Sequence, residues 1–231
     1  MKRIHLASRY VITGWVVTGL LTTPAFAQEH GGQKPGAMGH MDHKFDDPER
    51  YAKSFDDPAR DAWQMPARVI EALALKPGQK VADIGAGTGY FSVRLARAAA
   101  APKVFAVDLE PKMVEHLTKR AAAEGLTNFT AVQASPASPN LPEPVDVVLV
   151  IDTYHHIADR PAYFAALKSK LTPGGRVAIV DFKKGGGGDG PPDEFRFTPA
   201  QISGELAQAG YVLEQSHDFL PRQHYLIYRI K

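Results

Sequence analysis

Cysteine is absent from this chain of 231 residues. Disulfides, thiolate metal sites and cysteine nucleophiles are therefore excluded, and thiol content says nothing about the redox compartment. A long hydrophobic run is also missing, because the apolar stretch from Tyr10 to Leu21 is interrupted by Gly14 and Gly19. It falls well short of the roughly 20 residues of a membrane-spanning helix. The composition, 44% apolar and 23% charged, is typical of a globular protein, and the length fits one domain with a short appendage.

The N-terminus has the three parts of a secretory signal. Lys2, Arg3 and Arg9 form a positive start, the interrupted apolar stretch follows, and residues 25–27 (AFA) supply a small-x-small cleavage site. We therefore expect residues 1–27 to be a signal peptide and the mature protein to be exported to the periplasm or secreted. No stable membrane insertion is expected after cleavage, and without a working signal the protein stays in the cytoplasm.

The chain that follows this signal carries no excess of positive charge. Residues 1–27 carry three basic and no acidic side chains, so 27 − 3 = 24 Lys and Arg face 25 Asp and Glu, a formal charge of −1. Neutralisation of phosphates supplies most of the affinity for nucleic acids. A near-neutral chain without a basic patch is therefore not expected to act on nucleic acid.

Two segments precede the predicted catalytic domain. Residues 28–44 are rich in Gly, His and Met and lack apolar periodicity, so they are predicted to be a flexible linker; a solvated tail is favoured over a copper site, and no metal is expected. Residues 45–78 open with two similar stretches, Phe45–Arg50 and Phe55–Arg60, in which Asp precedes Pro as an N-cap precedes the first helical residue. We expect a helical lid or cap, with Trp63 and Gln64 either at the ligand crevice or against the sheet edge.

From residue 79 to the C-terminus, strand-like and helix-like stretches alternate, which is typical of a parallel sheet covered by helices. The predicted strands are apolar on both faces, as expected for a sheet covered on both sides. The last two are close enough in sequence to pair antiparallel. The strands are expected at 81–84, 104–107, 129–132, 145–151, 177–180, 211–216 and 224–230, and the helices at 90–100, 111–123, 161–171 and 199–209.

The first strand leads into a Gly-rich turn that is built for close approach of a ligand. Asp83 ends the strand, Gly85, Gly87 and Gly89 alternate along the turn, and a helix starts near Tyr90. The dinucleotide fingerprint needs a third glycine where Tyr90 stands. An acidic residue two before the first glycine suits a ligand with an ammonium group, so S-adenosylmethionine explains the turn better than a dinucleotide does.

A second acidic residue, Asp108, follows the next strand. A carboxylate at this place accepts hydrogen bonds from both ribose hydroxyls of a bound nucleoside. Asp108 therefore indicates a nucleoside without deciding between the two cofactors.

With these motifs in place, the chain from about Trp63 to Lys231 resembles a class I S-adenosylmethionine-dependent methyltransferase. The stretches that carry the resemblance are 81–89 (VADIGAGTG), 106–113 (AVDLEPKM), 144–151 (PVDVVLVI) and 171–177 (LTPGGRV). The resemblance implies a doubly wound, Rossmann-like α/β fold, with a seven-stranded sheet ordered 3-2-1-4-5-7-6 and the last strand antiparallel.

The resemblance also implies roles for single residues around the cofactor. Asp83 and the glycines of the turn lie near the methionine moiety, Asp108 at the ribose and Leu109 beside the adenine. Ser135 stands where relatives carry an Asp for the adenine amine, and Asp152, which follows the fourth strand, is added to the predicted cofactor contacts.

The acceptor side is predicted to lie after the fourth strand, where residues 152–156 (DTYHH) stand. His155 and His156 are the candidates for a general base, because imidazole titrates near pH 6.5; a purely structural role for both is the alternative. The sequence lacks an Asn-Pro-Pro-Tyr tetrad, which argues against methylation of adenine or glutamine amides. The expected acceptor is a small molecule or an exposed protein group. A non-catalytic binder of S-adenosylmethionine or a nucleoside, and a nicotinamide-dependent oxidoreductase, are the alternative functions.

Overall fold

A single mixed sheet organises the part of the chain that the computed structural model describes, residues 45–186 and 190–231. Its seven strands run in the order β3-β2-β1-β4-β5-β7-β6. All neighbouring pairs are parallel except those of β7, which runs antiparallel to both β5 and β6. The predicted order and the antiparallel last strand are confirmed. The strands are β1 (Lys80–Ile84), β2 (Lys103–Asp108), β3 (Phe129–Gln133), β4 (Val145–Ile151), β5 (Leu171–Phe182), β6 (Tyr211–His217) and β7 (Gln223–Ile230).

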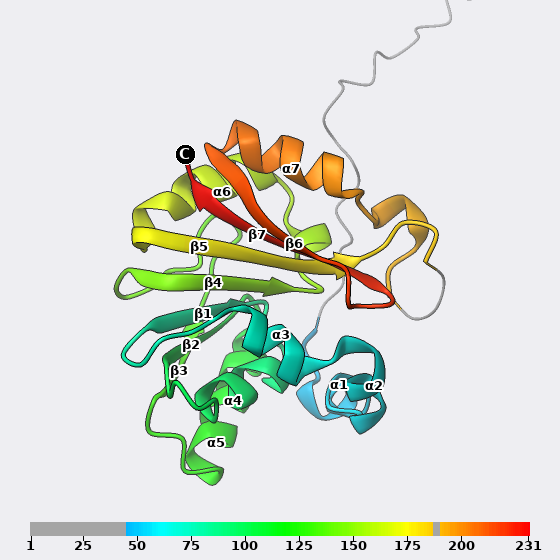
Figure 1. Ribbon diagram of the computed structural model, residues 1–231. Coiled ribbons are helices and arrows are strands. Elements are labelled where there is room, and N and C mark those ends of the chain that lie inside the picture. The colour runs from blue at the N-terminus through cyan, green and yellow to red at the C-terminus, as the bar shows by residue number, and fades with distance from the viewer. Residues whose placement is uncertain (1–44, 187–189) are drawn as a thin grey trace, which may run out of the picture. The chain divides into compact units, whose positions relative to one another are not determined.

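Helices cover both faces of this sheet, as Figure 1 shows. One apolar cluster joins α3, α4 and α5 to the sheet, and the other joins α6 and α7. β4 serves both clusters, with Val147 and Leu149 on the first face and Val148 and Val150 on the second. Burial on both faces explains why the strand sequence is almost continuously apolar. The helices are α3 (Pro66–Ala72), α4 (Tyr90–Ala96), α5 (Pro111–Ala123), α6 (Arg160–Leu167) and α7 (Pro199–Gln208).

The repeated Asp-Pro pattern forms two helix starts, as the sequence predicts. Asp47 accepts a hydrogen bond from the Arg50 N–H (3.1 Å) at the start of α1 (Pro48–Phe55). Asp57 accepts one from the Ala59 N–H (2.9 Å) at the 3₁₀ turn Pro58–Arg60, which leads into α2 (Asp61–Gln64). The side-chain oxygen satisfies an N–H that has no partner within the helix.

Three of the predicted boundaries given above were wrong by four residues or more. Helix α4 ends at Ala96 and not at residue 100, because the chain turns there before Pro102 and the next strand. Helix α6 ends at Leu167, and a 3₁₀ turn, Lys168–Lys170, replaces its predicted last residues. Strand β5 begins at Leu171, six residues earlier than predicted, since its register to β4 shifts around the Pro-Gly-Gly of residues 173–175.

The predicted signal peptide (1–27) and linker (28–44) lie outside the described residues. Within the described part, no helix combines the length and apolar character needed to cross a membrane. In the same residues, no group of three or more His, Asp or Glu side chains is placed to hold a metal ion.

Candidate active site

The Gly-rich turn joins the end of β1 to the start of α4 in a left-handed backbone. Gly85, Gly87 and Gly89 have φ values of +76°, +55° and +96°, a region that favours glycine. The N–H groups of Gly85 and Ala86 donate to the Val107 carbonyl at 2.8 and 2.9 Å, which fixes the turn to β2. A Cβ on Gly85 would overlap the side chain of Thr153, which follows β4. The turn therefore lies directly against the end of the neighbouring strand.

Asp83 is held beneath this turn in a buried position. Its side chain is almost inaccessible, with 3% of the residue exposed, and its Oδ2 accepts a hydrogen bond from the Ser92 hydroxyl at 2.5 Å. Burial raises the pKa of the Asp83 carboxyl to about 6, and the nearby charge of Asp108 adds to the rise, whereas the Ser92 hydrogen bond opposes it. A buried carboxylate with little compensation favours a cationic ligand group.

Asp108 lies at the end of β2 and supports the same turn. Its Oδ2 accepts the Gly87 N–H at 2.8 Å and its Oδ1 accepts the Glu110 N–H at 2.9 Å. Burial raises its pKa above the ordinary value, while these backbone hydrogen bonds act in the opposite direction. A carboxylate oxygen can accept two hydrogen bonds, so each Asp108 oxygen keeps capacity for a ligand hydroxyl group.

The residues predicted at the adenine lie beyond Asp108. Leu109 is one of two large apolar residues on the described surface that are exposed, at 47%, which suits a side chain that a flat ring covers. Ser135 follows β3 and donates to the Ser138 carbonyl at 3.3 Å. Gln133, at the end of β3, donates to the Leu109 carbonyl and so ties the two segments together.

Asp152 follows β4 in a left-handed conformation, with φ of +52°. Its Oδ2 accepts from the Gln64 amide at 2.8 Å and lies 3.4 Å from the Arg60 guanidinium, while its Oδ1 accepts from the Gln223 amide. Burial raises the pKa of Asp152 to about 6, the charge of Asp181 adds to the rise, and Arg60 opposes it. The backbone strain and the three donors show a carboxylate that is held in one place.

His155 forms a buried pair with Asp181, at the edge where β4 and β5 end. Its Nδ1 lies 2.9 and 3.0 Å from the two Asp181 oxygens, and its backbone N–H donates to the same carboxylate at 3.2 Å. Burial, the largest single influence, disfavours the charged imidazolium, but the charge and hydrogen bond of Asp181 together with the charge of Asp152 raise the pKa of His155. A carboxylate on Nδ1 fixes the tautomer and leaves Nε2 to accept a proton.

His156 takes a different position. Its ring lies 4.2 Å from the His155 ring and meets Phe45 edge-on at 5.6 Å. His155 is the candidate base for which the described residues show a carboxylate that orients the ring, Asp181.

The structure therefore brings the candidate residues together in two adjoining groups. The first surrounds the Gly-rich turn, and the second lies at the ends of β4 and β5; the close approach of Thr153 to Gly85 joins them. The sequence prediction missed three members of the second group: Arg60, Asp181 and Gln223. The fourth, Gln64, was expected either at the crevice or against the sheet edge, and it donates to Asp152 at 2.8 Å. Asp181 had a signal, because it directly follows the predicted strand 177–180 as Asp108 follows the predicted strand 104–107. Arg60 and Gln223 act through contacts between distant segments and gave none.

The groups around the turn fit S-adenosylmethionine. The glycines leave the backbone of the turn open to a ligand, and Asp83 offers a buried negative charge for an ammonium group. Asp108 keeps acceptors for hydroxyl groups, and Leu109 offers an apolar surface. The Thr88 hydroxyl within the turn is buried and has no hydrogen-bond partner among the described residues. Such an atom is costly unless a ligand or water completes it.

Comparisons with known proteins agree with this geometry. Residues 81–175 match a family model described as a methyltransferase domain. A protein-L-isoaspartate O-methyltransferase of Methylorubrum extorquens (strain PA1) is 37% identical over 120 residues, which are 52% of this chain and 49% of that protein. A phosphoethanolamine N-methyltransferase of Zea mays is 34% identical over 128 residues, 54% of this chain and 25% of that protein. The matches thus span about half or less of these relatives.

A solved structure extends the match to most of the fold. A SAM-dependent methyltransferase from Aquifex aeolicus superposes with a TM-score of 0.73 and 26% sequence identity, over 80% of this chain and 99% of that one. Together with the strand order and the Gly-rich turn, these likenesses support a class I S-adenosylmethionine-dependent methyltransferase.

Proposed function

We propose that this protein transfers the methyl group of S-adenosylmethionine to an oxygen or nitrogen nucleophile of a small molecule or an exposed protein group, with His155 as the general base. The observation that carries the proposal is the buried His155–Asp181 pair beside the Gly-rich turn. The relatives are named as an O- and an N-methyltransferase, and methylation of a hydroxyl or amine acceptor releases a proton, whereas methylation of a carboxylate does not.

In this proposal the chain's residues bind, orient and remove a proton. Asp83 binds the ammonium group, Asp108 the ribose hydroxyls and Leu109 the adenine face. Bound S-adenosylmethionine supplies an activated methyl group, so no nucleophilic side chain is needed and alignment dominates the rate. Asp181 holds the imidazole of His155 through Nδ1, and Nε2 takes the proton that the acceptor loses.

Calorimetry and a product assay test this function. We expect S-adenosylmethionine and S-adenosylhomocysteine to bind and NAD not to bind. Replacing Asp108→Ala is expected to weaken binding about 10- to 100-fold, since hydrogen bonds to a charged group contribute about 1.5–3 kcal/mol. A panel of phenols, alcohols, amines and carboxylates is then screened for S-adenosylhomocysteine release.

The outcomes separate the alternatives. Binding without release across the panel and with peptide acceptors favours a non-catalytic binder, and binding of NAD in place of S-adenosylmethionine favours an oxidoreductase. Unchanged affinity in Asp108→Ala contradicts the ribose contact.

We also propose that the enzyme acts after export. The support is the positive start, the apolar stretch and the AFA site in residues 1–27. Expression of the full chain in a bacterium, followed by mass spectrometry of the extracytoplasmic fraction, is expected to give a chain that begins at Gln28. An intact N-terminus in the cytoplasmic fraction contradicts export and implies use of cofactor where it is made.

A further inference from the structure

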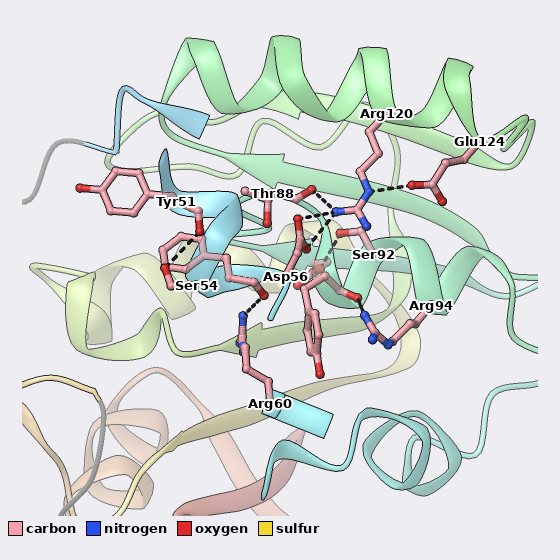
Figure 2. Close-up of polar contacts among 12 residues, drawn as sticks. Tyr51, Ser54, Asp56, Arg60, Thr88, Ser92, Arg94, Arg120 and Glu124 are labelled. Atoms are coloured by element: carbon pink, nitrogen blue, oxygen red, sulfur yellow. Dashed lines mark hydrogen bonds and ion pairs between the residues drawn. The ribbon is translucent and has the colours of Figure 1, made fainter. Parts of the chain in front are cut away.

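Residues 45–64, here named the cap segment, contact the cofactor turn through a carboxylate. Asp56 lies 3.0 Å from the Arg120 guanidinium, and the same guanidinium donates to the Thr88 carbonyl of the turn at 2.8 Å. Figure 2 shows Arg120 between Asp56, Thr88 and Glu124. The Arg120 side chain, which belongs to α5, therefore holds the cap segment and the turn together.

A second carboxylate of the cap segment holds the residue that follows the turn. Asp61 accepts a hydrogen bond from the Tyr90 hydroxyl and lies 3.0 Å from the Arg94 guanidinium. The Tyr90 ring is also contacted by two guanidinium groups, Arg60 at 4.3 Å and Arg94 at 3.8 Å from its centroid. Tyr90, which replaces the third glycine of a dinucleotide turn, thus serves as a docking point for the cap segment.

The cap segment also covers the backbone of the turn. A Cβ on Gly87 would lie 3.3 Å from the Phe55 ring, so this aromatic ring faces the glycine that the sequence marks for close ligand approach. Sealing of a bound ligand by this segment excludes water from the site.

At its other end the cap segment reaches the acceptor edge. Gln64 is fully buried and donates to Asp152 at 2.8 Å, and Arg60 binds both the Gln64 side chain and Asp152. Two of the three residues that hold Asp152 therefore belong to the cap segment, and the third is Gln223 of β7.

The attachment is mostly polar. Helix α1 has no buried residues, and the side chains of the Asp56–Arg120 and Asp61–Arg94 pairs are 22% to 51% exposed. Ion pairs at such exposure contribute little each, so this segment opens at lower cost than the sheet core.

We propose that the cap segment opens to admit S-adenosylmethionine, closes over it, and in closing brings Gln64 and Arg60 to position the Asp152 carboxylate. The inference rests on the proposed function for the identity of the ligand. Cofactor exchange is then limited by opening, and the acceptor edge is complete only in the closed state.

Stopped-flow dissociation of S-adenosylhomocysteine tests the closure. Asp56→Asn is expected to speed dissociation about two- to fivefold, because it weakens one partly exposed ion pair of the closed state. Asp46→Asn is the matched control: it makes the same chemical change at an exposed position of the cap segment, and its rate is expected to equal that of the wild type. Equal rates in both variants and the wild type overturn the proposal.

A double-mutant cycle tests the positioning role. Gln64→Leu keeps the side-chain volume and removes the amide donor; it is expected to speed dissociation in the wild-type background and to have no further effect in Asp152→Ala, because residues that act through each other are not additive. Additive effects overturn the positioning role.

In the wild type, ligand is also expected to slow hydrogen exchange of amides 48–64 at least tenfold, and unchanged exchange overturns closure. If the wild type binds no S-adenosylhomocysteine, it is the proposed function that fails.

Discussion

His155→Gln is expected to lower kcat/KM for methyl transfer about 10²- to 10⁴-fold, the range by which a positioned general base contributes. The reason is the loss of a candidate base whose Nδ1 is held by the Asp181 carboxylate. Affinity for S-adenosylhomocysteine is expected to stay within about twofold of the wild type, because the residue does not belong to the cofactor turn. The measurement uses the acceptor that the panel identifies.

The pH dependence gives an independent check on this role. A base must be neutral, so a raised pKa of His155 places the acid limb of the kcat/KM profile above the ordinary histidine value. Burial disfavours the imidazolium, and it is the Asp181 carboxylate that raises the pKa. Asp181→Asn removes that charge, and both the acid limb and the pKa from histidine NMR titration are expected to move to lower pH.

Two results would contradict the assignment of the base. The first is a full rate in His155→Gln at all pH values. The second is a loss in His156→Gln that exceeds the loss in His155→Gln, because His156 has an aromatic neighbour and its position lacks the Asp181 contact. In that case the base is the other histidine and the buried pair is structural.

The fold was predictable because local sequence patterns, such as apolar strands and glycines in turns, agree with the way the elements pack. Strand β4 is apolar at almost every position, since both faces are buried, and its predicted bounds, Val145–Ile151, match the structure. The glycines of the turn were also predictable, because all three have positive φ and Gly85 lies against the Thr153 side chain, where a Cβ would overlap. Local rules determine both features.

The residues around Asp152 were not predictable because they come from segments far apart in the chain. Gln64 and Gln223 are separated from Asp152 by 88 and 71 positions, so local sequence does not show that both meet at this carboxylate, although Gln64 was a candidate for the crevice. Asp181 is the exception: it lies at the carboxyl end of β5, next to β4, and carboxyl ends of parallel strands line the ligand crevice. A search for polar residues at every strand end, rather than at the first four strands alone, finds it.

Asp83→Asn is expected to stabilise the ligand-free protein by about 1–3 kcal/mol at pH 7.5, while it weakens S-adenosylmethionine binding about 10- to 100-fold. The carboxyl is 3% exposed, and burial raises its pKa from 3.8 to about 6. One pKa unit corresponds to about 1.4 kcal/mol, so the rise sets an upper limit of about 3 kcal/mol. Asn keeps the shape and an acceptor for the Ser92 hydroxyl but carries no charge.

The pH dependence of this stability change follows from the linkage between protonation and folding. Because the pKa is higher in the folded state than in the unfolded chain, the folded protein binds the proton more tightly, and the stability due to Asp83 is fully present below about pH 4 and lost as the pH rises through about 6. The advantage of Asp83→Asn is therefore expected to be largest above pH 7 and to vanish near pH 4.

Denaturant unfolding at pH 7.5 and pH 4, with calorimetry of S-adenosylmethionine binding at pH 7.5, measures both effects. Asp46→Asn again controls for the loss of one charge, at an exposed position. A variant that is less stable at pH 7.5 would show that the Asp83 charge is compensated within the protein. A more stable variant with weaker binding would mean that the Asp83 charge is buried without a cationic partner from the protein. The ammonium group of the cofactor then supplies that partner on binding.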